Sequence, residues 1–142
     1  MQISNAGLAL IKESEGLRLE AYKDAVGIWT IGYGSTGENV RPGMKITEDE
    51  ANDMLMADVM ECETCIEEHV TVDLTQGQFD ALCSFIFNLG CAAFTRSTLL
   101  RLLNEEDYDG AEQQFHRWVN AGGVKLAGLV TRRAAEAELF RA

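Results

Sequence analysis

The sequence predicts an α+β fold, mostly helical, in which 142 residues form a single domain of two lobes. A chain of this length can bury a substantial hydrophobic core in one domain. Short runs of aromatic and β-branched residues between turn residues predict a small β-containing lobe over about residues 17–46. Further along, apolar residues recur at helical spacing and predict a helical lobe over about residues 70–142. The first helix is expected to pack at the junction between the lobes.

The N-terminal helix is predicted from the signals at its two ends. Ser4 and Asn5 are both favourable N-cap residues, and Gly16 is favourable where a helix ends. Between them, Ile11 marks an apolar face. Glu15 lies four residues after Ile11, so its side chain is expected to leave the helix beside that face.

Two extended segments follow, at residues 19–22 and 28–33, with turn residues between them. Strand side chains alternate, so Thr30 shares one face of the second segment with Gly32 and Gly34. Glycine has no side chain, and these two glycines leave room for a ligand to approach the backbone. A hairpin that carries a binding face is therefore expected here.

Two capping-box patterns mark the longer helices. Thr47 with Glu50 begins a helix with an apolar stripe, and Thr75 with Gln78 begins a second helix that is apolar nearly all round. A helix without a polar face belongs at the centre of a domain. Shorter helices are predicted at about residues 97–104, 107–118 and 127–140.

The net charge of −11 is concentrated in one part of the chain. Residues 46–95 hold eleven acidic residues and no Lys or Arg. Nucleic acid is not expected as a partner, because phosphate binding needs basic patches. No apolar run approaches the roughly 20 residues of a membrane span, and the N-terminus lacks the features of a secretory signal. The chain is expected to stay where it is made, without stable membrane insertion, until something releases it.

The four cysteines allow more than one interpretation. Cys62 and Cys65 form a CxxC pair, which occurs in zinc and redox sites. The pair falls inside a predicted long helix with Cys62 on its apolar stripe, and no second CxxC follows. Buried reduced thiols without a metal are therefore favoured. A disulfide between Cys62 and Cys65, or between Cys83 and Cys91, is left open for an oxidised chain.

Glu15, Asp24 and Thr30 are the candidate catalytic residues. Eight residues separate the two carboxylates, and five separate Asp24 from Thr30. A helix end followed by a hairpin would bring all three to one cleft between the lobes, which is a usual place for a ligand. Two carboxylates and a hydroxyl are the groups needed to hydrolyse a glycosidic bond with inversion.

Each of these residues has its own expected role. Partial burial at a helix end would keep Glu15 protonated, so that it can act as general acid on the leaving oxygen. Asp24 would stay ionised and would activate a water or stabilise positive charge on the sugar ring, although it also suits an Asx turn. Thr30 would orient the attacking water, although strand propensity alone also explains a threonine there.

The same residues carry a resemblance to the phage-type lysozymes, the endolysins of glycoside hydrolase family 24. The Glu-x8-Asp-x5-Thr spacing and residues 30–34 are similar to that family's pattern, and the similarity extends over nearly the whole chain. The resemblance implies a lysozyme-like fold and a muramidase that cleaves the β-1,4 bond between N-acetylmuramic acid and N-acetylglucosamine, which lyses bacteria. It implies a monomer without a cofactor, with bacterial peptidoglycan as partner. A phage enzyme of this kind would act from the host cytoplasm and would need a membrane-permeabilising holin for release.

Carried over by position, the resemblance implies roles for further residues. Glu15 would be the general acid, Asp24 the second carboxylate and Thr30 the water-positioning residue. Four residues would contact substrate, namely Gly34, Phe87, Asn88 and Ser97. Three residues would support the site from the helical lobe, with packing and salt bridging as an equal interpretation, namely Arg117, Trp118 and Arg132. No metal ligand is implied.

The chain departs from the family's pattern at Ser35, where many relatives have His, and in its acidic middle segment. Ser35 removes a titratable group beside the cleft, and the negative charge slows encounter with an anionic wall. These departures motivate one alternative, a cell-wall glycan-binding protein of the same fold with weak or no catalysis. A second alternative is a lytic transglycosylase, which needs no water. Asp24 and Thr30 argue against it, because they suit water activation.

Overall fold

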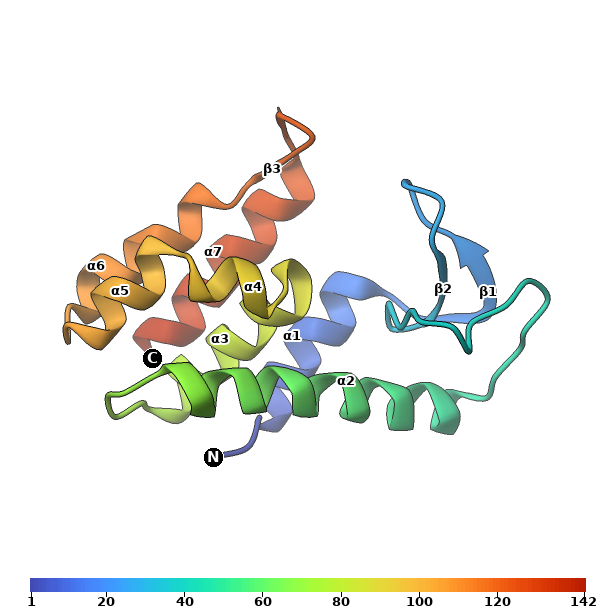
Figure 1. Ribbon diagram of the computed structural model, residues 1–142, viewed down its shortest axis with the longest axis horizontal. Coiled ribbons are helices and arrows are strands. Elements are labelled where there is room, and N and C mark those ends of the chain that lie inside the picture. Colours follow the sequence, from blue (N-terminus) through green and yellow to red (C-terminus); the bar gives the residue numbers. More distant parts are fainter.

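Helix α1 (Asn5–Glu15) lies between two groups of elements in the computed structural model, which describes residues 1–142 (Figure 1). On one side is the antiparallel hairpin of β1 (Arg18–Lys23) and β2 (Trp29–Gly32). On the other side are the later helices. Helix α2 (Glu48–His69) runs beneath both groups and joins them. The predicted two-lobed α+β fold, mostly helical, is confirmed.

The helical lobe also contains two elements that the sequence analysis did not predict, α4 and the β3–β4 hairpin. The three predicted shorter helices are present, the second of them as α6 followed by a 3-10 turn, η1. The predicted lobe bounds of 17–46 and 70–142 stay a prediction. In chain order the elements are α3 (Gln76–Leu89), α4 (Cys91–Thr95), α5 (Thr98–Asn104), α6 (Tyr108–Gln114), η1 (Phe115–Arg117), β3 (Asn120–Ala121), β4 (Val124–Lys125) and α7 (Ala127–Arg141).

Both predicted capping boxes are present. The Thr47 side chain accepts a hydrogen bond from the Glu50 backbone N–H at 3.1 Å, and the Glu50 carboxylate accepts one from the Thr47 N–H at 3.0 Å. Thr75 and Gln78 repeat the pattern at the start of α3. These bonds satisfy N–H groups that have no partner inside the helix, so each box fixes where its helix begins.

Helix α2 contributes to two hydrophobic cores. Leu55 and Val59 in its first half belong to a smaller core with Ile11 and Ile31. Ile66 in its second half belongs to the larger core of the helical lobe. With 22 residues the helix is about 33 Å long, which is enough to pass under both lobes.

Helix α3 is the centre of the larger core, as predicted. Every residue from 79 to 86 is buried. The Phe85 ring meets the rings of Phe94, Phe115 and Trp118 edge-on, at centroid distances of 6.3, 5.5 and 5.5 Å. Edge-to-face aromatic pairs of this kind add to the stabilisation from burial alone.

The cysteines differ from the prediction. Cys65 and Cys91 form a disulfide between α2 and α4, so the expectation of reduced thiols is wrong for these two, and neither pair left open for an oxidised chain is formed. The unpredicted helix α4 is the reason, because it begins at Cys91 and brings the two Cα atoms within 6.0 Å. Cys62 and Cys83 are buried free thiols, as expected. Burial raises the pKa of Cys62 to about 12 and also raises the pKa of Cys83.

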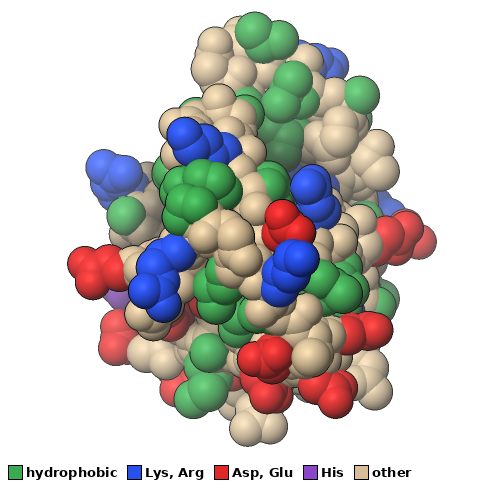
Figure 2. Space-filling view, turned by 90° about the vertical axis from the view of Figure 1, so that its right-hand side faces the viewer, with side chains coloured by type: hydrophobic (Ala, Val, Ile, Leu, Met, Phe, Trp, Pro, Cys, Tyr) green, Lys and Arg blue, Asp and Glu red, His purple; other side chains and the backbone are tan.

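Charge is unevenly spread over the surface. On the face in Figure 2, acidic side chains gather along the lower edge, the side on which α2 lies in Figure 1. Nine of the eleven acidic residues between 46 and 95 belong to α2. None of the helices combines the length and apolar character that crossing a bilayer requires.

Candidate active site

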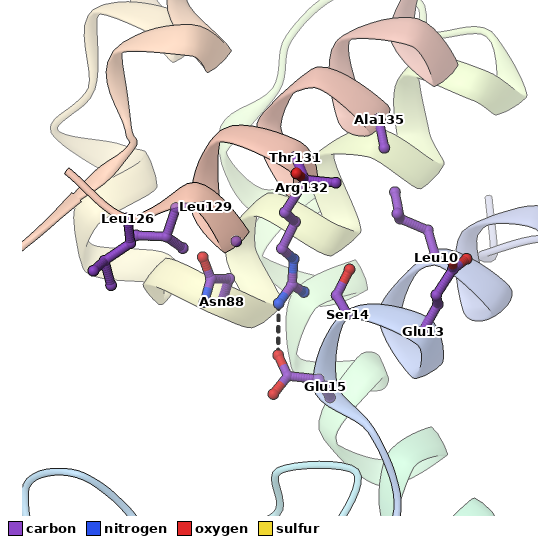
Figure 3. Close-up of a pocket in the computed structure, with 11 residues that line it drawn as sticks. Leu10, Glu13, Ser14, Glu15, Asn88, Leu126, Leu129, Thr131, Arg132 and Ala135 are labelled. Atoms are coloured by element: carbon purple, nitrogen blue, oxygen red, sulfur yellow. Dashed lines mark hydrogen bonds and ion pairs between the residues drawn. The ribbon is translucent and has the colours of Figure 1, made fainter.

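A hollow of about 630 Å³ lies between α1 and α7 (Figure 3). Glu15 enters it from α1, Arg132 from α7 and Asn88 from α3, while Leu126 and Leu129 form an apolar side. The cavity thus brings together three of the residues predicted from the sequence. A concave region with a few polar groups among apolar side chains is a usual ligand site.

Glu15 is the last residue of α1, and Gly16 ends the helix as predicted, with a φ of 74°. The Glu15 side chain is 21% exposed, so the expected partial burial is confirmed. Its Oε2 accepts a hydrogen bond from Arg132 Nη1 at 2.7 Å, drawn as the dashed line in Figure 3. One oxygen of the carboxylate is therefore held in an ion pair at the edge of the cavity.

Gly34 lies against the other oxygen of Glu15. A Cβ atom built on Gly34 would be 2.8 Å from Glu15 Oε1, a separation that real Cβ atoms essentially never show. The φ of Gly34 is 87°, which also favours glycine. Glycine therefore allows the loop after β2 to approach the carboxylate. The predicted contact of Gly34 with substrate stays a prediction.

Arg132 is itself held by buried polar partners. Its side chain is 6% exposed, and it donates hydrogen bonds to the Ser84 hydroxyl at 3.3 Å and to the Ser84 carbonyl at 3.2 Å. The Ser84 hydroxyl donates to Glu136 Oε2 at 2.5 Å, and this oxygen lies 3.5 Å from Arg132 Nε. These contacts fix the plane of the guanidinium, so Nη1 remains directed at Glu15.

Glu136 also faces a second buried cation. Arg133 Nε and Glu136 Oε1 are 2.8 Å apart, an ion-pair distance without hydrogen-bond alignment, and Arg133 Nη2 donates to Asn88 Oδ1 at 2.7 Å. Burial raises the pKa of Glu136, opposed by Arg133 and the Ser84 hydroxyl. Burial lowers the pKa of Arg133, opposed by Glu136. Two carboxylates, Glu15 and Glu136, thus offset two guanidinium groups within one network.

Asp24 lies in the turn between β1 and β2 and does not line the cavity of Glu15. Its Oδ1 accepts hydrogen bonds from the backbone N–H groups of Val26 and Ile28, both at 2.9 Å. This is the geometry expected of an Asx-type turn residue. Because Oδ1 takes both bonds, Oδ2 is left for other partners.

Thr30 is on β2, 4% exposed, and is also outside the lining of that cavity. Its hydroxyl donates to the Ile28 carbonyl at 2.9 Å. A hydroxyl has one proton and two lone pairs, so this bond leaves Oγ1 able to accept but not to donate. Any water bound there would donate its own hydrogen to Thr30.

The other residues predicted for the site lie in different parts of the structure. Ser97 caps α5, accepting from the Leu100 N–H at 3.1 Å and donating to a backbone carbonyl at 2.6 Å. Phe87 packs against both cores and lines, with Gly34, a second hollow of about 250 Å³.

Trp118, one of the three residues expected to support the site, packs on Phe85, as its packing interpretation expected. Arg117 is exposed on η1, so of the three supporting residues Arg132 is the one that contacts Glu15.

Ser35, the departure from the family's pattern, is 3% exposed and donates to Asp58 Oδ2 at 2.6 Å. Asp58 belongs to α2, so this bond ties the β-containing lobe to the helix that joins the lobes. A serine hydroxyl is neutral across the whole working range of pH. The link therefore does not depend on the titration of a histidine.

The sequence analysis missed Asp58, Ser84 and Glu136. Two signals were available for the last two. Glu136 lies four residues after Arg132 on one helix, a spacing at which side chains meet. Ser84 is a polar residue in a helix that is otherwise apolar nearly all round, and a buried hydroxyl needs a partner.

Comparisons with known proteins agree over nearly the whole chain. Residues 12–136 match the family described as Phage lysozyme. An endolysin of Acyrthosiphon pisum secondary endosymbiont phage 1 is 46% identical, over 99% of this chain and 98% of the relative. The structure of the muramidase domain of SpmX from Asticaccaulis excentricus is 41% identical, with a TM-score of 0.93 over 99% of this chain and 98% of that one. A mutant P22 lysozyme is 42% identical, with a TM-score of 0.89 over 100% and 99%.

Proposed function

The chain belongs to the phage lysozyme family, and from that premise we propose how its residues act on the bacterial wall. It is a peptidoglycan hydrolase, a glycoside hydrolase of the lysozyme type, with an endolysin and a muramidase domain among its relatives. The bond cleaved is the β-1,4 bond between N-acetylmuramic acid and N-acetylglucosamine, and its cleavage lyses bacteria. Glycan binding without catalysis is not favoured, because these relatives are named an endolysin and a muramidase domain.

One observation carries the role of Glu15, namely a carboxyl group at the edge of a cavity with a buried arginine 2.7 Å away. In its protonated form Glu15 donates its proton to the glycosidic oxygen as the bond breaks. The step leaves a carboxylate, which Arg132 stabilises. Because Ser84 and Glu136 already hold Arg132, little reorganisation is needed when the charge forms.

Asp24 is the proposed second carboxylate and Thr30 the proposed water-positioning residue. The Thr30 hydroxyl already donates to a backbone carbonyl, so it receives a hydrogen from the water and turns the water's lone pair outward. Asp24 Oδ2 is free to accept the second hydrogen. Inversion fits this arrangement when the two carboxyl groups lie about 6.5–9.5 Å apart. Substrate contacts by Gly34, Phe87, Asn88 and Ser97, and support by Arg117 and Trp118, rest on the resemblance alone.

The test of the acid is digestion of purified peptidoglycan by a Glu15→Gln variant. Glutamine keeps the size of the side chain but cannot donate the proton, so we expect loss of activity with an unchanged fold. Glu38→Gln, an exposed residue in the loop before α2, is the control for the loss of one negative charge. Products are identified by mass spectrometry. Hydrated products from the wild type and none from Glu15→Gln support the proposal. Anhydro sugars indicate a transglycosylase instead. Full activity of Glu15→Gln would exclude Glu15 as the general acid.

The remaining proposals concern the cellular setting and rest on family membership. We propose that the chain acts as a monomer, collects in the bacterial host cytoplasm and needs a holin for access to the wall. Light scattering of the purified chain tests the monomer. Expression in bacteria with and without a pore-forming membrane protein tests release, because lysis is expected only when both are present.

A further inference from the structure

A second cluster of reactive side chains lies where α4 meets α2, outside the cavity of Glu15. Cys65 and His69 are four residues apart on α2, and Cys91 is the first residue of α4. One potential ligand atom from each residue lies within 4.8 Å of the other two. Cys65 is buried, and the other two are half-buried. In the structure the two sulfur atoms form the disulfide.

We propose that Cys65, His69 and Cys91 form a zinc site when this disulfide is reduced. Tetrahedral Zn²⁺ binds thiolate sulfur at about 2.3 Å and imidazole nitrogen at about 2.0–2.1 Å, so its ligand atoms lie roughly 3.5–3.8 Å apart. The Cα atoms of Cys65 and Cys91 are 6.0 Å apart and the three ligand atoms lie within 4.8 Å of one another, so rotation of the side chains can bring the reduced ligands to that spacing. Two thiolates and one imidazole leave a fourth position for water.

His69 already makes the outer contact that is usual for a histidine bound to a metal. Its Nδ1 lies 2.9 Å from the carbonyl oxygen of Cys65. With the proton on Nδ1, this nitrogen donates to the carbonyl and the lone pair on Nε2 is free for a metal. The end of α2 is anchored as well, because the Asn104 amide donates to the His69 carbonyl at 2.9 Å.

The charge of α2 favours a cation, while Arg96, directly after α4, donates to the Ala92 carbonyl at 3.2 Å. Residues 46–95 contain no Lys or Arg, and α2 alone carries nine acidic residues. Without a metal, the two thiols of the reduced chain are neutral, and binding of the ion releases their protons. The two thiolates then cancel the charge of the divalent ion, and the acidic side chains of α2 do not oppose its approach.

Zinc and the disulfide exclude each other, because both use the same two sulfur atoms. A dithiol reductant supplies the two electrons and two protons that open the disulfide, and it becomes a disulfide itself. Zn²⁺ then displaces the two thiol protons into water. Either form ties α2 to α4, so the link between these helices persists in reducing and in oxidising surroundings. This inference does not depend on the proposed enzymatic role.

The test is a metal titration of the full chain after reduction with dithiothreitol and removal of the reductant under anaerobic conditions. We expect one Co²⁺ per chain, with the visible bands of tetrahedral cobalt and thiolate-to-cobalt charge transfer, and displacement by Zn²⁺. The oxidised chain should show neither band. His69→Ala should weaken zinc binding at least about tenfold, since even outer contacts are worth roughly 10–100-fold.

Two variants serve as controls. His116→Ala removes the other histidine, which is exposed on η1, and should bind as the wild type does. Cys83→Ala removes a buried thiol outside the cluster and should also leave binding unchanged. Circular dichroism before and after zinc addition reports folding. Metal binding by the reduced wild type that is weakened in His69→Ala and in Cys91→Ser would support the site. No binding by the reduced wild type, or binding by these two variants as tight as that of the wild type, would overturn it.

Discussion

Replacing Gly34 with alanine tests whether the position of the Glu15 carboxylate limits the reaction. The new Cβ would lie 2.8 Å from Glu15 Oε1, whereas ordinary contacts begin at 3.4 Å, so the oxygen must move by about 0.6 Å. A misplacement of about 1 Å can cost roughly 100-fold in rate, so we expect kcat to fall about 10- to 100-fold. Alanine at a φ of 87° also costs roughly 1–2 kcal/mol of stability. That corresponds to a fall in Tm of about 2–8 °C.

Gly43→Ala separates these two effects. Gly43 has a similar φ of 80°, but a Cβ there meets nothing within 4 Å. Both variants should lose similar stability in thermal unfolding, and only Gly34→Ala should lose activity in a reducing-sugar assay on solubilised glycan chains. A raised KM with unchanged kcat would mean that Gly34 acts through substrate contact instead. If Gly34→Ala keeps the wild-type kcat, the close approach to Glu15 has no catalytic importance and the reasoning is refuted.

Three further predictions concern stability. The disulfide between Cys65 and Cys91 closes a loop with a sequence separation of 26. Its reduction in the presence of a chelator should lower the free energy of unfolding by about 3.5 kcal/mol, measured by urea unfolding. An unchanged urea midpoint would contradict this. Burial raises the pKa of Cys62 from 9.0 to about 12, so between these pH values the thiol ionises in the unfolded chain but not in the folded chain. The contribution of Cys62 to the free energy of unfolding is therefore complete below pH 9 and falls by about 1.4 kcal/mol per pH unit from 9 to 12. Cys62→Ala should remove that part of the alkaline slope in unfolding experiments at pH 8 and pH 10. Ser35→Ala should cost about 1–2 kcal/mol by removing the hydrogen bond to Asp58, and Asp58→Ala made in that background should then cost less than it does alone.

The parts of the fold that local patterns determine could be predicted from the sequence. The capping boxes at Thr47 and Thr75 depend on residues three apart, so they locate the starts of α2 and α3 without any tertiary information. Helix α4 has five residues, too few for a detectable period. The β3–β4 hairpin did have a signal, because Gly122 and Gly123 form its two-residue turn at positive φ.

The candidate site likewise has parts that the sequence predicts and parts that it does not. The spacing of Glu15 and Asp24 is local, and the pattern drew attention to both. The contact between Glu15 and Arg132 spans 117 residues, and no local rule relates them. The resemblance pointed to Arg132 but not to the buried groups that hold it. Ser84 and Glu136 each carried a local signal, but neither signal shows that the two side chains meet, because that contact forms only after α3 and α7 have packed.

Helix α1 is anchored at the end remote from Glu15 by a buried carboxylate. The backbone N–H of Ser4 donates to Asp80 Oδ1 at 2.9 Å, and the Ser4 hydroxyl also donates to Asp80. One turn further on, Gly7 lets α1 approach α3 closely, since a Cβ there would lie 2.9 Å from the Cβ of Asp80. This end of α1 is therefore fixed to the most buried helix of the molecule.

Both ends of α1 are held by residues of the same helix, α3, and these contacts position Glu15. Asp80 holds the start of α1 directly, and Ser84, one turn later on α3, holds the other end through Arg132. A helix of 11 residues transmits position over about 16 Å without much bending. The carboxyl group of Glu15 is thus located relative to the rigid centre of the helical lobe. Asp24 and Thr30, in contrast, belong to the hairpin, so their distance from Glu15 depends on how the hairpin packs against α1, whereas the contact of Glu15 with Arg132 does not.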